Sequence, residues 1–177
     1  MSLLPDAFYK PAHIGVFESL VKACLDNINQ FSTPNLNWID TSDIKEMNNL
    51  MSYRNVFADI SRWDVSNVTS MIYLFENSSV NCDISNWNVS SVRDMHSMFA
   101  KADIHTNISK WDVHNVEDMN RMFMYTEFDE DFDISGWDVS SVKNMNAMFN
   151  GSDFAGDISK WNVSEVTDMG AMFGGTH

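Results

Sequence analysis

Asp59-Ile60-Ser61-Arg62-Trp63-Asp64-Val65-Ser66-Asn67-Val68-Thr69-Ser70-Met71-Ile72-Tyr73-Leu74-Phe75 is one copy of a tandem repeat that runs through most of the chain. Tryptophans recur at spacings of 24 to 26 residues, and a methionine follows each of them after eight or nine residues. Such a fixed period is the signature of a repeat array. The aligned residues are Trp38, Trp63, Trp87, Trp111, Trp137 and Trp161, followed by Met47, Met71, Met95, Met119, Met145 and Met169.

Each copy has two halves with different apolar spacings. The first half reads Ile-x-x-Trp-x-Val, and the alternation of Trp and Val predicts a short strand. The second half reads Val-x-x-Met-x-x-Met/Leu-Phe, which predicts a short helix with one apolar face. A helix of about eight residues is not stable alone, so neighbouring copies must stack and share one core.

The full unit, D-I-S-x-W-[DN]-V-S-x-V-x-x-M-x-x-M-F, resembles the repeat of the BspA-type leucine-rich-repeat surface proteins, including the mycoplasma-type lipoprotein repeat. The match covers about residues 36–173 and departs from the pattern at Asn35 and in the longer segment Tyr125–Asp133. The resemblance implies a right-handed solenoid, a bacterial or microbial-eukaryote source, and roles in surface exposure and adhesion. It implies no catalytic residue.

The predicted fold class is therefore α/β: a right-handed leucine-rich-repeat-like solenoid of short parallel strands and short helices, with an N-terminal capping helix. Residues 1–35 are predicted to be a lead-in and this capping helix, and residues 36–177 a solenoid of about six repeats within the same domain. Residues 12–30 carry an amphipathic stripe, Ile14, Phe17, Val21, Cys24 and Ile28. A membrane or partner helix would share this pattern, but solenoids need a lid on the terminal core, which favours capping.

Composition limits the functional classes. The formal net charge of −14 disfavours nucleic acid and anionic membrane surfaces as partners. Cys24 and Cys82 do not make a disulfide framework, and we expect both to be reduced and packed. The chain shows no signal peptide and no apolar run long enough to insert into a membrane, so a cytoplasmic location stays open beside the cell-surface or secreted location that the resemblance suggests.

The candidate binding site is the outward face of the predicted strands. Residues flanking each Trp are expected to point away from the core and to form rows of Asp/Asn between Lys/Arg, which would suit a protein or glycan ligand. The alternative is that the same Asp, Asn and Ser side chains serve the fold by capping turns and bridging neighbouring units. The candidate residues are Arg62, Asp64, Asn86, Asn88, Lys110, Asp112, His114, Asp138, Lys160 and Asn162.

An acidic segment offers a second, weaker candidate. Asp129-x-Asp131-x-Asp133 resembles the start of an EF-hand loop, but Ile134 and Ser140 stand where Gly and Glu are required. It is not an EF-hand; a weak calcium site is the alternative to a solvated loop.

No catalytic or nucleotide-binding motif is present in the sequence, and no histidine pair has metal-ligand spacing. We therefore expect no cofactor and no enzymatic activity. The leading hypothesis is a non-enzymatic binding or adhesion module. The alternative is a structural spacer or self-associating scaffold, because no polar capping unit follows Phe173 and the last repeat should expose its apolar edge.

Overall fold

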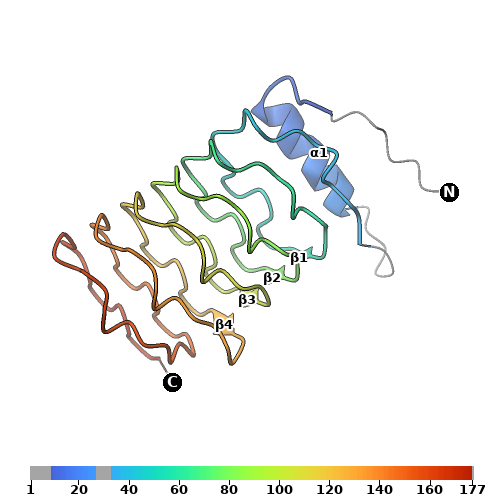
Figure 1. Cartoon of the computed structure of the whole chain (residues 1–177). Helices are drawn as coiled ribbons and strands as arrows, with labels where there is room; N and C mark the ends of the chain where they lie inside the picture. The colour runs from blue at the N-terminus through green and yellow to red at the C-terminus, as the bar shows by residue number, and fades with distance from the viewer. Residues whose placement is uncertain (1–8, 27–32, 177) are drawn as a thin grey trace.

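The computed structural model describes residues 9–26 and 33–176. Its regular elements are one helix, α1 (Ile14–Asp26), and four two-residue strands: β1 (Asn55–Val56), β2 (Ser79–Val80), β3 (Asp103–Ile104) and β4 (Glu127–Phe128). The strands form one parallel sheet in the order β1-β2-β3-β4. The protein thus belongs to the α/β class (Figure 1).

Successive turns of the chain, which we call coils, lie side by side in register. Val56 pairs with Val80, Val80 with Ile104, and Ile104 with Phe128, each 24 residues further on. A second line of parallel bridges links Glu46, Ser70, Asp94, Asp118, Asn144 and Asp168 in turn. Figure 1 shows the coils stacked from α1 at one end to the C-terminus at the other.

The strands lie outside the segments predicted to form them. In the Ile-x-x-Trp-x-Val segment the predicted alternation of burial holds, since Trp63 and Val65 are buried on either side of the exposed Asp64. The backbone, however, makes tight turns: the Trp63 N–H donates to the Ile60 carbonyl at 3.1 Å, and the Val68 N–H donates to the Val65 carbonyl at 2.9 Å. These local bonds replace a strand ladder, and the short strands lie in the return segment that precedes the aligned Ile.

The short helices predicted for each repeat are also wrong. The N–H groups of Met71, Tyr73 and Phe75 donate to carbonyls of the next coil at 2.8 to 3.0 Å, whereas Leu74 donates back to Met71. Tyr73 has φ 54°, a left-handed conformation that no α-helix accommodates. Within the described residues α1 is the only helix. The left-handed position recurs in every later coil, at Ser97, Arg121, Ala147 and Ala171.

The predicted Trp, Val and Met positions form one continuous core, which extends from Phe17 to Met172. Each repeat phenylalanine stacks on the next with ring centroids 5.5 to 5.7 Å apart, from Phe75 through Phe173. Met169 is the exception among the predicted core residues, because it lies in the last coil and is 40% exposed. The buried members of that set are Trp63, Trp87, Trp111, Trp137, Trp161, Met71, Met95, Met119 and Met145.

The first coil corrects the sequence alignment. Ile39, and not Trp38, occupies the tryptophan position, because its N–H donates to the Leu36 carbonyl at 3.1 Å as Trp63 does to Ile60. The period of 24 residues therefore also holds in this coil. Trp38 lies to one side, where its carbonyl accepts the N–H of Tyr9 at 2.8 Å.

Helix α1 covers the first coil, as the capping prediction requires (Figure 1). It buries Phe17, Val21 and Leu25, and the Phe17 ring lies 5.5 Å from the Trp63 ring. The helix begins at Ile14 and not at residue 12, and Ile14 is 43% exposed. Ile28, the last residue of the predicted stripe, lies outside the described residues. No helix in residues 9–26 and 33–176 has the length and apolarity needed to span a membrane.

Candidate functional site

All ten residues predicted for the binding face are exposed, although the wall that carries them is made of turns and not of strands. Neighbouring coils are held in register beneath them by tryptophan. The Trp87 indole N–H donates to the Ile60 carbonyl at 3.2 Å, and the Trp111 indole donates to the Ile84 carbonyl at 3.0 Å. Equivalent side chains therefore line up from coil to coil. We call this surface, defined by the ten residues, the outward wall.

The Asp/Asn row of the outward wall is committed to turn formation. One carboxylate oxygen of Asp64 accepts both the N–H and the hydroxyl of Ser66, at 3.0 and 2.6 Å. In Asp112 the same oxygen accepts the backbone N–H of His114 at 3.3 Å and lies 2.6 Å from its Nδ1. Bonds from Ser140 lower the pKa of Asp138 below its ordinary value. Asn88 and Asn162 make the same turn bond. The structural role is thus present, and the second oxygen or amide stays available to a ligand.

Two further rows of Asp/Asn turns were not predicted. In the D-I-S tripeptide, Asp59, Asp83, Asn107, Asp133 and Asp157 each accept the N–H of the residue two positions on. Asp94, Asp118, Asn144 and Asp168 do the same beside the methionines. The sequence signal for the first of these rows was the repeated Asp/Asn-x-Ser, which is the pattern of a side chain that bonds its own turn, whereas the row beside the methionines shares only its Asp or Asn.

Three members of the row beside the methionines, Asp94, Asp118 and Asn144, are partly buried. Burial raises the pKa of Asp94, and the neighbouring carboxylate of Asp118 raises it further. In the next coil the row carries Asn144 in place of an aspartate, and its side-chain amide donates to the Asp118 carboxylate at 3.0 Å. On the same side, Tyr73 Oη lies 2.9 Å from His96 Nε2.

Glu117 lies between two cations from adjacent coils. Its carboxylate is 2.5 Å from Lys143 Nζ and 3.2 Å from the Arg93 guanidinium. The bond and charge of Lys143, followed by those of Arg93, lower the pKa of Glu117. All three side chains are substantially exposed, so this row is a solvated link between coils.

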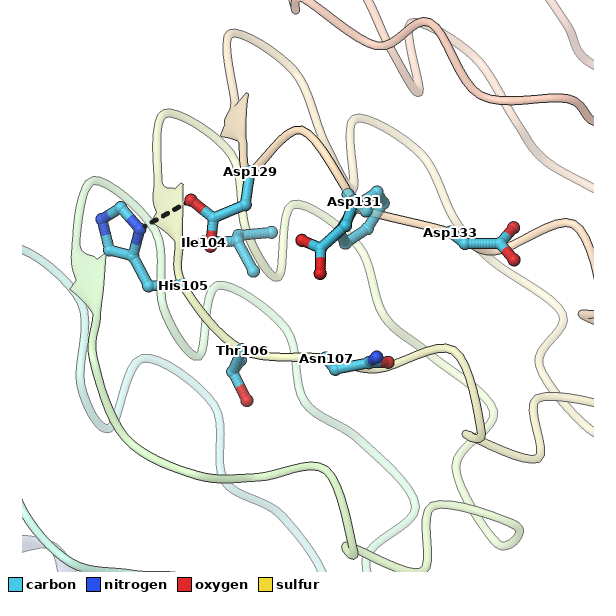
Figure 2. Close-up of a pocket in the computed structure, with 8 residues that line it drawn as sticks. Ile104, His105, Thr106, Asn107, Asp129, Asp131 and Asp133 are labelled. Atoms are coloured by element: carbon cyan, nitrogen blue, oxygen red, sulfur yellow. Dashed lines mark hydrogen bonds and ion pairs between the residues drawn. The ribbon is translucent and has the colours of Figure 1, made fainter.

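Figure 2 shows the acidic segment predicted as a weak calcium site. Asp129 lies 3.1 Å from His105 Nδ1, Asp131 lies beside the hollow, and Asp133 accepts the Ser135 N–H at 2.8 Å. The three aspartates follow one another along the loop and do not converge. Among residues 9–26 and 33–176, no three His, Cys, Asp or Glu side chains come together as metal ligands.

Two hollows flank this loop, and sequence reasoning did not anticipate them. The first, of about 160 Å³, lies between the loop and the segment after β3 (Figure 2). The second, of about 280 Å³, is lined by Phe128, Asp129, Glu130, Phe132, Asp153 and Phe154. The only sequence signal was the extra length of the segment.

The last coil exposes an apolar hollow of about 490 Å³, as predicted for a terminal repeat. Val163, Met169 and Phe173 are 38%, 40% and 47% exposed. In the preceding coil the N–H groups of Met145 and Phe149 donate to the next coil. Within the described chain, the equivalent N–H groups of the last coil have no backbone acceptor.

Both cysteines are free, which confirms the prediction for this pair. Cys82 is buried, and burial raises the pKa of its thiol to about 12. Cys24 is partly buried against the core, and burial raises its pKa as well. Neither thiol is activated as a nucleophile, since a reactive cysteine requires a lowered pKa.

The geometry defines an α/β protein with a repeat-like parallel sheet. Comparison with protein families then places the chain: residues 19–125 and 102–177 match the family described as "Mycoplasma protein of unknown function, DUF285". Because the match covers most of the chain, the protein belongs to this family. No curated protein and no solved structure matches the chain.

Proposed function

We propose that this protein is a non-enzymatic binding module, a right-handed leucine-rich-repeat-like solenoid of the BspA type, which recognises a protein or glycan through its outward wall at a cell surface or after secretion. The observation that supports the proposal is the outward wall itself: ten exposed polar side chains in rows, of which Asp64, Asn88, Asp112, Asp138 and Asn162 are held by turn bonds.

The turn bonds matter for affinity as well as for folding. Asp64 and Asp112 each use one oxygen for the turn, which restricts the rotamer and orients the other oxygen. Binding to such a row loses little side-chain conformational entropy, because the side chains are already ordered. Repeats of this kind place equivalent groups about 4.8 Å apart, a spacing suited to extended ligands.

The test is a glycan-array and surface-protein pull-down screen in which the wild type is compared with the triple variant Asp64→Asn/Asp112→Asn/Asp138→Asn. Asparagine keeps the turn acceptor, as Asn88 and Asn162 do, so this variant loses charge without losing the turn. We expect captured ligands to be lost by the triple variant and by Lys110→Ala.

A matched control removes three charges from a different row. Asp59→Asn/Asp83→Asn/Asp157→Asn alters the D-I-S turns, where Asn107 already shows that asparagine is accommodated. Retained binding in this control assigns recognition to the outward wall. An equal loss of ligand binding in both variants would show that binding depends only on net charge, which would contradict the proposal.

The exposed end of the stack favours a second candidate function, a self-associating scaffold. In the preceding coils the next coil covers the equivalent surface. In the last coil that surface is the hollow at Trp161, Met169 and Phe173, beside N–H groups that have no backbone acceptor within the described chain. Light scattering over a wide concentration range tests this proposal. A strict monomer, unchanged by Phe173→Glu, would reject it.

A further inference from the structure

The 24-residue register is interrupted at one place in the described repeats, directly after β4. Four residue positions separate Ile104 from Ile108, but six separate Phe128 from Ile134. The extra length lies in Asp129–Asp133, which we call the inserted loop. Its backbone closes with a turn bond from the Phe132 N–H to the Asp129 carbonyl at 3.0 Å.

Three phenyl rings gather beneath the inserted loop. The Phe128 ring lies 4.3 Å from the Phe132 ring and 5.7 Å from the Phe154 ring. In the three preceding coils the Phe128 position is held by Val56, Val80 or Ile104, which are at most 1% exposed, whereas in the following coil it is held by Phe154. All three rings remain partly exposed, so these two coils present aromatic surface where the preceding coils present none.

The rings are rigidly supported from below. Phe154 stacks on the core residue Phe149 with centroids 4.2 Å apart and ring planes inclined by 15°. The backbone runs close over its edge at Gly156, where an added Cβ would lie 2.6 Å from the ring. The hollow of about 280 Å³ is therefore bordered by a ring that packs against the core.

The rim of this aromatic hollow is uniformly acidic. Asp129, Glu130 and Asp153 line it. Within residues 9–26 and 33–176, the ion pairs include no lysine or arginine partner for any of the three, and Asp129 meets only His105. Asp153 also accepts the Phe128 N–H at 3.2 Å, which ties the rim to the ring cluster.

We propose that this hollow binds an arginine side chain presented by a basic segment of a partner protein. A guanidinium stacks on aromatic faces and donates to carboxylates in the same plane. Phenyl faces below and carboxylates at the rim supply both complements, whereas an anionic or neutral ligand would leave the carboxylates uncompensated. The site is separate from the outward wall.

The experiment measures binding of a fluorescent nine-residue peptide with a single central arginine in a Gly/Ser background, by anisotropy. Peptides with lysine and with glutamine at the same position serve as comparisons. We expect the arginine peptide to bind the full chain tighter than the lysine peptide, and the glutamine peptide not to bind. Equal binding of arginine and glutamine peptides would overturn the proposal.

Two variants test the two halves of the site. Glu130→Gln/Asp153→Asn removes rim charge while asparagine keeps the acceptor for Phe128, and we expect a loss of about tenfold in affinity, or roughly 1.4 kcal/mol. Phe132→Leu keeps an apolar side chain but removes a ring, and we expect a loss of a few-fold. Circular dichroism confirms that both variants fold.

The matched control is Asp83→Asn/Glu165→Gln, which removes the same charge elsewhere on the chain. Arginine-peptide affinity within twofold of wild type in this control assigns the effect to the hollow. An equal loss would show bulk electrostatic attraction and overturn the proposal. The outward-wall triple variant should bind the arginine peptide normally, so failure of the proposed function would not affect this result.

Discussion

Arg121→Gly reverses the usual effect of glycine, because Arg121 lies in a left-handed turn. Its φ is 53°, and its N–H donates to the Asn146 carbonyl at 2.9 Å, a bond that glycine keeps. The side chain is exposed, and its guanidinium forms no ion pair within the described residues. Relief of backbone strain is therefore the main consequence of the substitution.

The magnitude follows from two opposing effects. A non-glycine residue in the left-handed region costs roughly 1 to 2 kcal/mol. Glycine adds conformational freedom to the unfolded chain, which costs about 0.4 to 1 kcal/mol. We expect Arg121→Gly to raise the free energy of unfolding by about 0.5 to 1 kcal/mol. In the helix that the apolar spacing predicted, the same change would lower it by about 1 kcal/mol.

Urea unfolding, followed by far-UV circular dichroism and tryptophan fluorescence, measures whether Arg121→Gly raises or lowers the free energy of unfolding. Arg121→Val should destabilise, since β-branched residues tolerate positive φ poorly. Lys110→Gly is the control: Lys110 is exposed and is not among the positive-φ residues, so glycine should lower stability there by about 0.5 kcal/mol. A lower unfolding free energy for Arg121→Gly, with an unchanged dependence on urea, would refute the turn assignment.

Three other outcomes follow from the packing and charge of the coils. Trp111→Phe removes the indole donor of the Ile84 carbonyl and should cost about 1 to 2 kcal/mol in the same unfolding assay. Met119→Ala should lower the free energy of unfolding by about 2 to 5 kcal/mol because Met119 is fully buried. The same substitution at the partly exposed Met169 should lower it by less than half as much. Asp94→Asn should stabilise by up to about 1 kcal/mol at pH 7, because burial and a neighbouring carboxylate raise the pKa of Asp94. A raised carboxyl pKa means that the folded state gains stability as the pH falls through it, so the advantage of Asp94→Asn should shrink in acid, as unfolding at pH 7 and pH 4 would show.

Sequence reasoning predicted burial better than conformation. The spacing of Val68, Met71 and Leu74 correctly identified buried residues, but three-residue spacing fits a chain of tight turns as well as a helix. The distinguishing feature is the left-handed residue of each coil, and Tyr73 and Arg121 carry no sequence mark of that conformation. A glycine at these positions would have indicated the left-handed conformation, as Gly151, with φ 67°, does at the second left-handed position of its coil.

The first coil shows a different limit. Trp38 attracted the alignment because tryptophan is the most distinctive repeat residue, yet the hydrogen bonds place Ile39 in that position. A smaller side chain there leaves the Trp63 ring free to contact Phe17 of α1. The cap and the degraded repeat are thus complementary, a relation that is visible only in three dimensions.

The candidate sites divide in the same way. Alternation predicted that Asp64 and Asp112 are exposed and in rows, because that inference needs only the register. The aromatic hollow was not predictable, because Phe128, Phe132 and Phe154 come from two coils and meet only once the register is known. The extra length of the inserted loop indicated a departure but not its chemistry.

The hydrogen bonds between coils run in opposite directions on different walls of the stack. Met71, Tyr73 and Phe75 donate forward to the next coil, whereas Arg93 and Asp103 donate backward to Thr69 and Ser78. The peptide dipoles of the two walls therefore oppose one another, unlike those of an α-helix, which add along its axis. Each added coil therefore contributes peptide dipoles that partly offset one another, so the electrostatic asymmetry of the stack grows less with length than that of a helix.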